Sequence, residues 1–418
     1  MPSSNLGRGS SSGVERKLPK LDVAGSIPVS RSTFPPLSLP IYLLLCLAFS
    51  LAACGPKHLV PESPLDTAAN HYQRGLAQLE AGAAMDAERE FERARLLDPD
   101  FPGSQVGMAL VAAEGKDFWR ARQELAKALH KDGRFADAYI ALGRIVTAEG
   151  VQRGYPVDTW SKEALAAYKK AGEHDPDNPA VPYYRGRCFL EAMQLEPARV
   201  SFAEALGKAR GPWVKRTQDA LGQVQLIERV APGSSWGLKI ALLPRITRGE
   251  LSVLLIEELK LDELSRQRRL APDPPQFRDP SQPAADSLAQ ATDISTSWAR
   301  PWIEQVLKLG VAGLETTPDH LFQPGMAINR ANMALVTQGI LVLLTGDQEL
   351  ATRYLGEASR FPDVRSDSYA YSAIALNAER GIITADQLSG LFHPEDPVSG
   401  GEALQIIRNL QNAVRLDF

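Results

Sequence analysis

The 418-residue sequence has few residues of the kinds that mark a metal site. It contains only three cysteines and six histidines, with neither a Cys-x-x-Cys nor a His-x-x-x-His pair. Such pairs are typical of metal sites, because their spacing brings two ligands to one ion. A Walker-type phosphate loop and a dinucleotide fingerprint are also absent. The sequence therefore predicts no metal, no cofactor and no enzymatic activity, although an acid pair for glycoside hydrolysis would assemble only in three dimensions.

Positive charge is also scarce. The chain has 46 lysines and arginines against 50 aspartates and glutamates, and no basic block stands out. Nucleic-acid recognition usually needs a basic stripe, so no nucleic-acid partner is predicted. The sequence also lacks a long apolar run near its start. The segment from Ile41 to Leu51 is shorter than the ~20 residues that a transmembrane helix needs, which favours a cleaved signal.

The apolar segment leads directly into Leu51-Ala52-Ala53-Cys54. Two small residues before a cysteine resemble the lipobox of bacterial lipoproteins. The resemblance implies that residues 37–53 are a signal peptide and that Cys54 is acylated, which would tether the chain to a membrane. Gly55, rather than Asp, follows Cys54, and resemblance to lipoproteins of diderm bacteria then implies the outer membrane, facing the periplasm. A buried helix with an ordinary cysteine is the alternative.

Residues 1–36 mix serine, glycine and proline without a periodicity that would bury one face. They resemble an open reading frame extended through a neighbouring transfer-RNA gene, so we interpret them as a hypothetical misassigned start. N-terminal mapping of the precursor tests this hypothesis. Residues 54–65 are then a linker.

Only one free cysteine is expected after cleavage of the signal peptide and acylation of Cys54. Cys46 leaves with the signal and Cys54 is acylated, so no intramolecular disulfide is predicted. Cys188 lies in a helical pattern and is interpreted as a small core residue rather than a nucleophile.

Residues 66–230 repeat with a period of 34 residues. Small residues recur where two helices would cross, and a large residue recurs beside them. The pattern comprises Gly75, Ala87, Phe91, Ala94 and Pro99, then Ala109, Ala121, Leu125 and Ala128, then Gly143, Ala164, Tyr168, Ala171 and Pro176, then Gly186, Ala198, Phe202 and Ala205. It resembles the tetratricopeptide repeat, which implies a solenoid of helical hairpins whose concave groove takes a peptide or partner protein.

The ends of the repeats are marked by proline. Asp98-Pro99 and Asp175-Pro176 are predicted to end second helices, because a residue before proline disfavours the helical conformation. Gly211-Pro212 precedes an amphipathic segment, residues 213–230, that we interpret as a capping helix. The third copy carries nine extra residues around 150–160, either a contact loop or a tolerated surface insertion.

Residues 236–418 form a different domain after a turn-rich joint at residues 231–235. Three apolar helices each begin after a residue that suits a helix N-cap, namely Thr247, Asn329 and Ser399. Glu250, three residues after Thr247, completes a capping box.

The last two helix starts share an upstream framework. Asp293-Ile294 matches Asp363-Val364, Trp298 matches Tyr369, Leu309-Gly310-Val311 matches Arg380-Gly381-Ile382, and Phe322-Gln323-Pro324 matches Phe392-His393-Pro394. These residues resemble S-layer homology modules. The resemblance implies a three-module helical bundle that docks proteins onto the cell wall by binding peptidoglycan-linked or secondary wall polysaccharides. The first module keeps only its second half.

The resemblance also suggests glycan-binding residues. Arg248 is the first candidate, with Thr247 and Glu250 beside it, because an arginine at a helix N-terminus suits an acidic sugar. Arg330 is the second candidate. The alternative for Arg248 is a structural role, as a salt bridge or as support for the cap.

Two positions depart from the family pattern, since Asn332 replaces an acidic residue and Gly400 replaces an arginine. Trp298 and Trp302 are able to stack on sugar. Their spacing of four nevertheless favours a core position for both. Residues 270–291 are predicted to be a polar surface insertion.

We therefore expect an all-α, lipid-anchored, non-enzymatic protein of the cell envelope. Its repeats would bind a protein partner, and its modules a wall glycan. The alternative is an assembly or secretion accessory lipoprotein whose modules bind protein instead of glycan. A wall-modifying enzyme is a third possibility.

Overall fold

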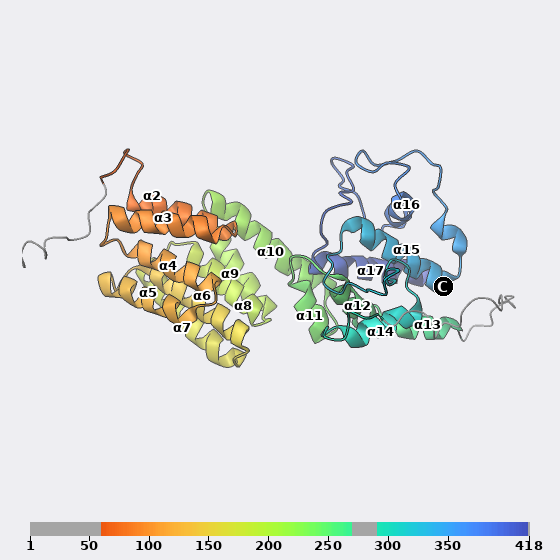
Figure 1. Cartoon of the computed structure of the whole chain (residues 1–418), viewed down its shortest axis with the longest axis horizontal. Coiled ribbons are helices and arrows are strands. Elements are labelled where there is room, and N and C mark those ends of the chain that lie inside the picture. Colours follow the sequence, from red (N-terminus) through yellow and green to blue (C-terminus); the bar gives the residue numbers. More distant parts are fainter. Residues whose placement is uncertain (1–59, 270–290, 417–418) are drawn as a thin grey trace, which may run out of the picture. The chain divides into compact units, whose positions relative to one another are not determined.

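The computed structural model describes residues 60–269 and 291–416, and the regular secondary structure of these residues is helical (Figure 1). The predicted all-α fold is confirmed there. Cys54, the signal segment 37–53, the extension 1–36 and nearly all of the predicted insertion 270–291 lie outside the described residues. Within the described part, no helix has the length and apolar character to cross a bilayer.

The first part of the described chain is a series of antiparallel helical hairpins followed by one longer helix (Figure 1). The hairpins pair α2 (Ala68–Glu80) with α3 (Ala84–Leu97), α4 (Pro102–Glu114) with α5 (Phe118–Lys131), α6 (Ala136–Arg153) with α7 (Val157–His174), and α8 (Ala180–Glu191) with α9 (Leu195–Lys208), and α10 (Pro212–Val230) follows. The predicted breaks are confirmed, because α3 and α7 end just before the Asp-Pro pairs and α10 begins at Pro212.

The predicted small-to-large packing is also confirmed. A Cβ atom added to Gly75 would lie 2.5 Å from the Phe91 ring. Gly107 of the next hairpin approaches the same ring even more closely, with 2.2 Å to an added Cβ. Gly143 and Gly186 meet Tyr168 and Phe202 in the same way, at 2.5 and 2.7 Å. Glycine is therefore required where the large residue is aromatic, because a ring fills the space that a Cβ would occupy.

The prediction of a surface insertion around residues 150–160 is confirmed in part, because residues 151–159 are exposed whereas Gly150 and Trp160 are buried. Both α6 and α7 have 18 residues, against 13 and 14 in the first hairpin, so the extra residues lengthen both helices. Trp160 is buried, and a Cβ added to Gly150 would lie 2.3 Å from its ring. The insertion thus repeats the glycine-aromatic pairing farther along the same hairpin.

The C-terminal part packs helices of unequal length around one hydrophobic core. Its helices are α11 (Ser235–Ala241), α12 (Arg248–Glu257), α13 (Leu261–Arg269), α14 (Arg300–Leu309), α15 (Arg330–Thr345), the 3-10 turn η2 (Gln348–Ala351), α16 (Tyr371–Glu379) and α17 (Gly400–Leu416). Ile227 and Val230, at the end of α10, belong to the same core.

Backbone hydrogen bonds join the three module starts in a closed ring. The amide of Ile246 donates to the carbonyl of Val398 at 2.9 Å, Val398 donates to Ile328 at 3.0 Å, and Ile328 donates back to Ile246 at 3.0 Å. All three side chains are buried, and each residue immediately precedes one of the predicted N-cap residues. The three helices α12, α15 and α17 therefore start from one buried centre.

A buried ion pair fixes the turn between α10 and α11. The side chain of Glu258 is 1% exposed and accepts hydrogen bonds from the amides of Gly233 and Ser234, both at 2.9 Å. Arg408 of α17 donates to Glu258 at 2.7 Å and to the carbonyl of Val230 at 3.0 Å. Burial alone would raise the pKa of Glu258, but the hydrogen bonds from Gly233, Ser234 and Arg408 hold it below its ordinary value.

Candidate functional site

Arg248, at the start of α12, directs its guanidinium group at the backbone of the second module. Nε donates to the carbonyl of Phe322 at 2.8 Å, Nη1 to Gly313 at 3.0 Å, and Nη2 to Glu315 at 2.8 Å. The group also lies 4.7 Å from the centre of the Phe322 ring. Burial lowers the pKa of Arg248. The three donors hold the Phe-x-Pro loop of the second module against the first module.

Arg330, at the start of α15, repeats this arrangement one module later. Nε donates to the carbonyl of Phe392 at 2.8 Å and Nη2 to that of Thr384 at 2.8 Å, while Nη1 pairs with Glu402. The guanidinium group lies 4.8 Å from the centre of the Phe392 ring. Each arginine therefore binds the loop of the module that follows it.

The third position explains why Gly400 stands where the family pattern has arginine. Its amide donates to the carbonyl of Leu243 at 2.9 Å, and an added Cβ would lie 1.7 Å from the carbonyl oxygen of Ile240. Helix α11 packs against α17 here. An arginine at position 400 would therefore find no space beside the backbone of Ile240.

The loops are held from their other side by aspartates. Asp293 accepts hydrogen bonds from the amides of Phe322 and Gln323, at 2.8 and 2.7 Å. Asp363 likewise accepts from Phe392 and His393, at 2.9 and 2.7 Å. Burial raises the pKa of Asp363, but these amides outweigh that effect and lower it. Sequence analysis paired the aspartates without giving them a role, although each precedes its phenylalanine by 29 residues.

Thr247 and Glu250 are engaged with each other in the predicted capping box, which is confirmed. The carboxylate of Glu250 accepts from the amide of Thr247 at 2.7 Å, and the Thr247 hydroxyl accepts from the amide of Glu250 at 3.5 Å. The caps at Asn329 and Ser399 are also confirmed, since each side chain accepts an amide three residues later. Contact of Thr247, Glu250, Arg248 or Arg330 with a glycan stays a prediction.

A cluster of three tryptophans borders the same domain. Trp298 stacks on Trp236 with ring centres 4.9 Å apart and planes inclined by 18°, and Trp302 meets both edge-on. Trp302 is partly buried, and its indole N–H donates to Glu257 at 2.8 Å. Trp298 is 48% exposed, so the prediction that it belongs to the core is wrong. Trp298 lies in the turn before α14 rather than in the helix, so the helical spacing assumed for the two tryptophans does not apply, and Trp236 of α11 leaves Trp298 half uncovered.

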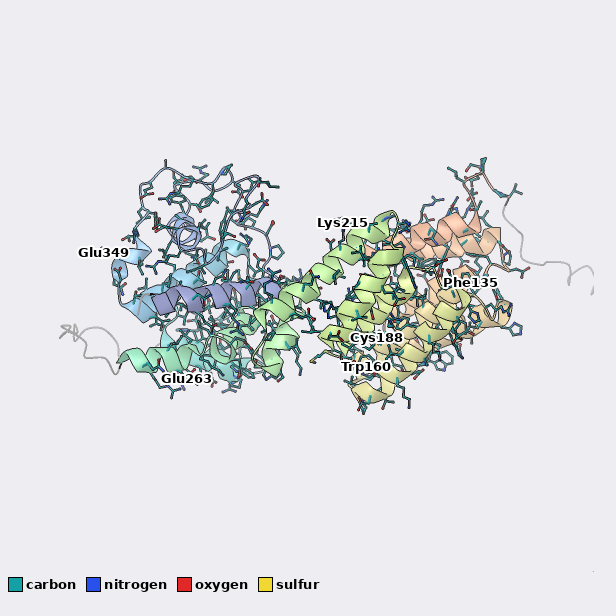
Figure 2. The ribbon with its side chains drawn as sticks, turned by 180° about the vertical axis from the view of Figure 1, so that it is seen from behind. Phe135, Trp160, Cys188, Lys215, Glu263 and Glu349 are labelled. Atoms are coloured by element: carbon teal, nitrogen blue, oxygen red, sulfur yellow. The ribbon has the colours of Figure 1, made fainter. Side chains whose placement is uncertain are left out.

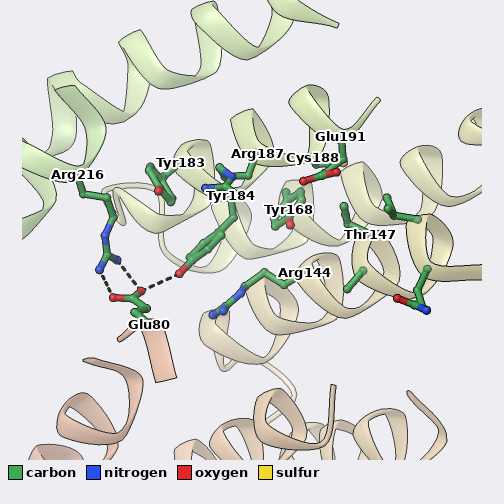
Figure 3. Close-up of a pocket in the computed structure, with 13 residues that line it drawn as sticks. Glu80, Arg144, Thr147, Tyr168, Tyr183, Tyr184, Arg187, Cys188, Glu191 and Arg216 are labelled. Carbon is green, nitrogen blue, oxygen red and sulfur yellow. Dashed lines mark hydrogen bonds and ion pairs between the residues drawn. The ribbon is translucent and has the colours of Figure 1, made fainter. Parts of the chain in front are cut away.

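The concave side of the hairpins is a groove with two adjoining cavities, of about 520 and 170 Å³, that share Glu80, Arg144 and Tyr184 (Figure 3). Glu80, at the end of α2, pairs with Arg216 of α10 through both guanidinium Nη atoms and accepts from the Tyr184 hydroxyl at 3.0 Å. Arg144 lies 4.4 Å from the centre of the Tyr184 ring. The sequence predicts a groove here. It does not predict that these four residues meet in it.

Cys188 is buried beside Trp160 and Tyr168 in one hydrophobic cluster, which confirms its interpretation as a core residue (Figure 2). Burial raises the pKa of its thiol, and a low thiolate fraction is unsuited to a nucleophile. In the described ranges, no group of three or more histidine, cysteine or acidic residues is placed to hold a metal ion.

Comparison with known proteins supports one S-layer homology module in this chain. Residues 360–404 match the S-layer homology domain, and this range contains α16 and the start of α17. Two solved structures are similar: TTC0263, a thermophilic TPR protein of Thermus thermophilus, with 18% identity, and PilF of Pseudomonas aeruginosa, also with 18% identity. They cover 48% and 40% of this chain and 96% and 93% of their own, with TM-scores of 0.33 and 0.20. No curated protein matches the chain significantly.

Proposed function

We propose that this protein is a non-enzymatic adaptor of the cell envelope, whose C-terminal domain attaches to a cell-wall polysaccharide and whose groove holds a partner protein. The S-layer homology match at residues 360–404 carries the first part, because this domain typically binds wall polymers. The repeated geometry of Arg248 with Phe322 and of Arg330 with Phe392 supports a second module of the same kind.

Trp298 is the residue that we propose for sugar contact. Its ring is fixed by stacking on Trp236 and remains half exposed, so an apolar face is already ordered before any ligand arrives. Preorganised aromatic faces bind at low entropic cost. Arg248 and Arg330 then act as positioning residues that hold the modules together, since their donors are directed at protein carbonyls.

Membrane attachment is part of the proposal. Acylation of Cys54 would tether the N-terminus, and a diacylglycerol with an additional amide-linked chain meets the requirement of two anchors for stable membrane binding. The protein would then link the outer membrane, on its periplasmic side, to the wall. Cleavage of the precursor before Cys54 and labelling of Cys54 by a fatty-acid analogue are the expected results.

One observation favours the alternative of an accessory lipoprotein whose modules bind protein. The arginines at the two complete module starts already bind backbone carbonyls and, for Arg330, a carboxylate. A domain that uses its arginines in this way has fewer cationic donors for an acidic glycan. Binding of a purified wall polymer decides between the two functions.

The test is cosedimentation of the full chain with purified peptidoglycan sacculi. The full chain is needed because Ile227 and Val230 of α10 belong to the C-terminal core. We expect the wild type to sediment and Trp298→Ala to bind about tenfold more weakly, as stacking on one ring contributes about 1 kcal/mol or more. Leu388→Ala, at a side chain that is 99% exposed, is the matched control and should bind normally.

Arg248→Ala separates positioning from direct sugar contact. A positioning role predicts a lower melting temperature with normal binding well below it, whereas sugar contact predicts weak binding by a variant that is still folded. Wild-type protein that stays in the supernatant would contradict wall attachment and favour the accessory function.

A further inference from the structure

The segment that leads into the first hairpin is fastened to it by side chains. Asp66, just before α2, is buried, and its carboxylate accepts a hydrogen bond from the amide of Glu62 at 2.7 Å. Arg93 of α3 donates to the carboxylate of Asp66 at 2.7 Å and to that of Glu62 at 3.0 Å. Residues 62–66 are therefore held on the first hairpin although they form no helix.

His71 of α2 lies at the centre of these contacts. Its two ring nitrogens face different carboxylates, since Nε2 lies 2.7 Å from Asp66 and Nδ1 lies 2.5 Å from Glu90 of α3. A neutral imidazole carries a hydrogen on one ring nitrogen only, so it can donate to one of these carboxylates but not to both. Only the doubly protonated ring of His71 satisfies both contacts.

The charges in this cluster balance only when the His71 ring is charged. Three carboxylates and two arginines of the described chain form ion pairs here, namely Glu62, Asp66, Glu90, Arg74 and Arg93. Arg89 of α3 lines the same cavity but pairs with Asp86. Loss of one proton from the ring therefore leaves two positive charges against three negative ones. The hydrogen bond from Arg93 holds the pKa of Asp66 well below its usual range, so this carboxylate stays ionised far into the acid range.

We propose that His71 is the proton-dependent centre of a latch that holds residues 62–66 on the first hairpin. The latch consists of Glu62, Asp66, His71, Glu90 and Arg93. It is closed while the ring carries two protons and opens as the pH rises and the ring loses one, because a poorly solvated carboxylate is then left without its donor. The ring lines a cavity of about 760 Å³ that is open to solvent, so its protons exchange with the surrounding water.

The latch would set how far the hairpins reach from the membrane, a consequence that rests on the proposed acylation of Cys54. Glu62 follows Cys54 by 8 residues, and Thr67, the N-cap of α2, follows it by 13. An extended chain spans at most about 3.5 Å per residue, so the closed latch allows about 28 Å between the anchor and the first hairpin, and the open latch about 45 Å. A rise in pH would thus lengthen the tether without breaking a covalent bond.

The experiment measures amide hydrogen exchange of the full chain in detergent, in peptides that cover residues 60–67, from about pH 5 to about pH 9. Protection, corrected for the intrinsic exchange rate, should fall about tenfold as the pH rises, because one charge-assisted hydrogen bond is lost. His71→Gln should show low protection at every pH, and His71→Arg, which keeps its charge, should show high protection at every pH. His130→Gln is the matched control, because His130 is exposed on α5, and it should behave as the wild type does.

Protection of the wild type that does not change with pH would overturn the latch, and so would protection that still changes in His71→Gln. Thermal unfolding shows whether His71→Arg is folded. If it is not, the wild type and His71→Gln still decide the question, together with the nuclear magnetic resonance signal of the His71 ring. That signal should titrate over the pH range in which protection falls, and titration over a different range would overturn the proposal.

A second measurement separates the latch from the anchor. A donor dye on Met85→Cys, at an exposed position of α3, reports energy transfer to acceptor lipids in vesicles of phosphatidylethanolamine and phosphatidylglycerol. Transfer should fall as the pH rises, and it should be constant in His71→Arg and in His71→Gln, higher in the first. Constant transfer in the presence of pH-dependent protection would overturn the change in tether length and leave the latch standing. A chain that does not bind the vesicles would contradict acylation of Cys54, whereas hydrogen exchange would still decide the latch.

Discussion

The hairpins and the C-terminal domain solve the same packing problem in different ways. In the hairpins, neighbouring helices meet through glycine and aromatic side chains, as Gly75 and Gly107 do with Phe91. In the C-terminal domain, segments far apart in the sequence meet through backbone groups and arginines, as Arg248 does with Phe322. The first arrangement repeats locally and extends in one direction, whereas the second closes on itself.

This difference predicts how far the loss of stability caused by one substitution extends through the structure. A solenoid of hairpins distributes its stability over neighbouring contacts, so a local change loosens one hairpin and its neighbours. A closed ring offers no end from which to unravel, so a change at one junction should destabilise all three. The following variants test this contrast, from the largest expected effect to the smallest.

The largest effect is expected at the buried pair of Glu258 and Arg408. Glu258→Ala leaves the Arg408 guanidinium without its carboxylate and should lower the free energy of unfolding of the C-terminal domain by about 3–5 kcal/mol. Chemical denaturation followed by amide hydrogen exchange in α12, α15 and α17 measures this, because tryptophan fluorescence would also report on Trp119, Trp160 and Trp213 of the hairpin region. A loss below about 1 kcal/mol would contradict a stabilising role for this buried pair.

The same residue gives a pH dependence. Its folded pKa lies below the ordinary value of 4.5, so its contribution is present above that pH and is lost as the pH falls through the folded pKa. The stability difference between wild type and Glu258→Gln should therefore be constant near neutral pH and shrink below pH 4.5. A difference that grows on acidification would contradict the sign of this shift.

A smaller effect is expected for Gly400→Ala. The added Cβ would lie 1.7 Å from the backbone oxygen of Ile240, and a backbone atom cannot move aside as a side chain can. We expect a loss of about 3 kcal/mol, at the upper end of overpacking effects. Amide hydrogen exchange should rise at Ile246 and Ile328 as well as near α17, whereas a change confined to α17 would show that the junctions are independent.

The smallest effect is expected in the hairpins, where the effect of Gly107→Ala on stability should change sign when the Phe91 ring is removed. Gly107→Ala alone forces a Cβ against the Phe91 ring and should cost about 1–2 kcal/mol. In a Phe91→Leu background the ring is gone, and the same substitution should be neutral or stabilising by up to about 1 kcal/mol, because alanine favours the helix. A double-mutant cycle measured by thermal unfolding gives the coupling. Additive effects would mean that the ring does not dictate glycine at position 107.

The sequence predicts most of the fold because the informative patterns are local. Hairpin crossings, Asp-Pro ends and the three N-caps each involve residues close in the chain, and all are confirmed. The extra residues around 150–160 were predicted only in part, since an insertion by itself does not reveal that Gly150 and Trp160 continue the helical packing.

The sites were harder to predict, because they depend on distant contacts. Trp298 was assigned to the core from helical spacing, but the helix begins only at Arg300 and leaves Trp298 in an exposed turn. Glu80 and Arg216 are 136 residues apart and meet only after the hairpins have stacked. Arg248 was identified as important, yet its partners, the carbonyls of a loop in another module, carry no side-chain signal in the sequence.

The ring of Ile246, Ile328 and Val398 also sets an order of events during synthesis. Each hairpin can pack on its predecessor as soon as both helices have emerged, because its contacts are local. Two of the three junctions of the ring require Val398, so the ring cannot close until the segment that leads into α17 is available. A chain shortened before Val398 would present two open junctions at once, and only the hydrogen bond between Ile328 and Ile246 would remain.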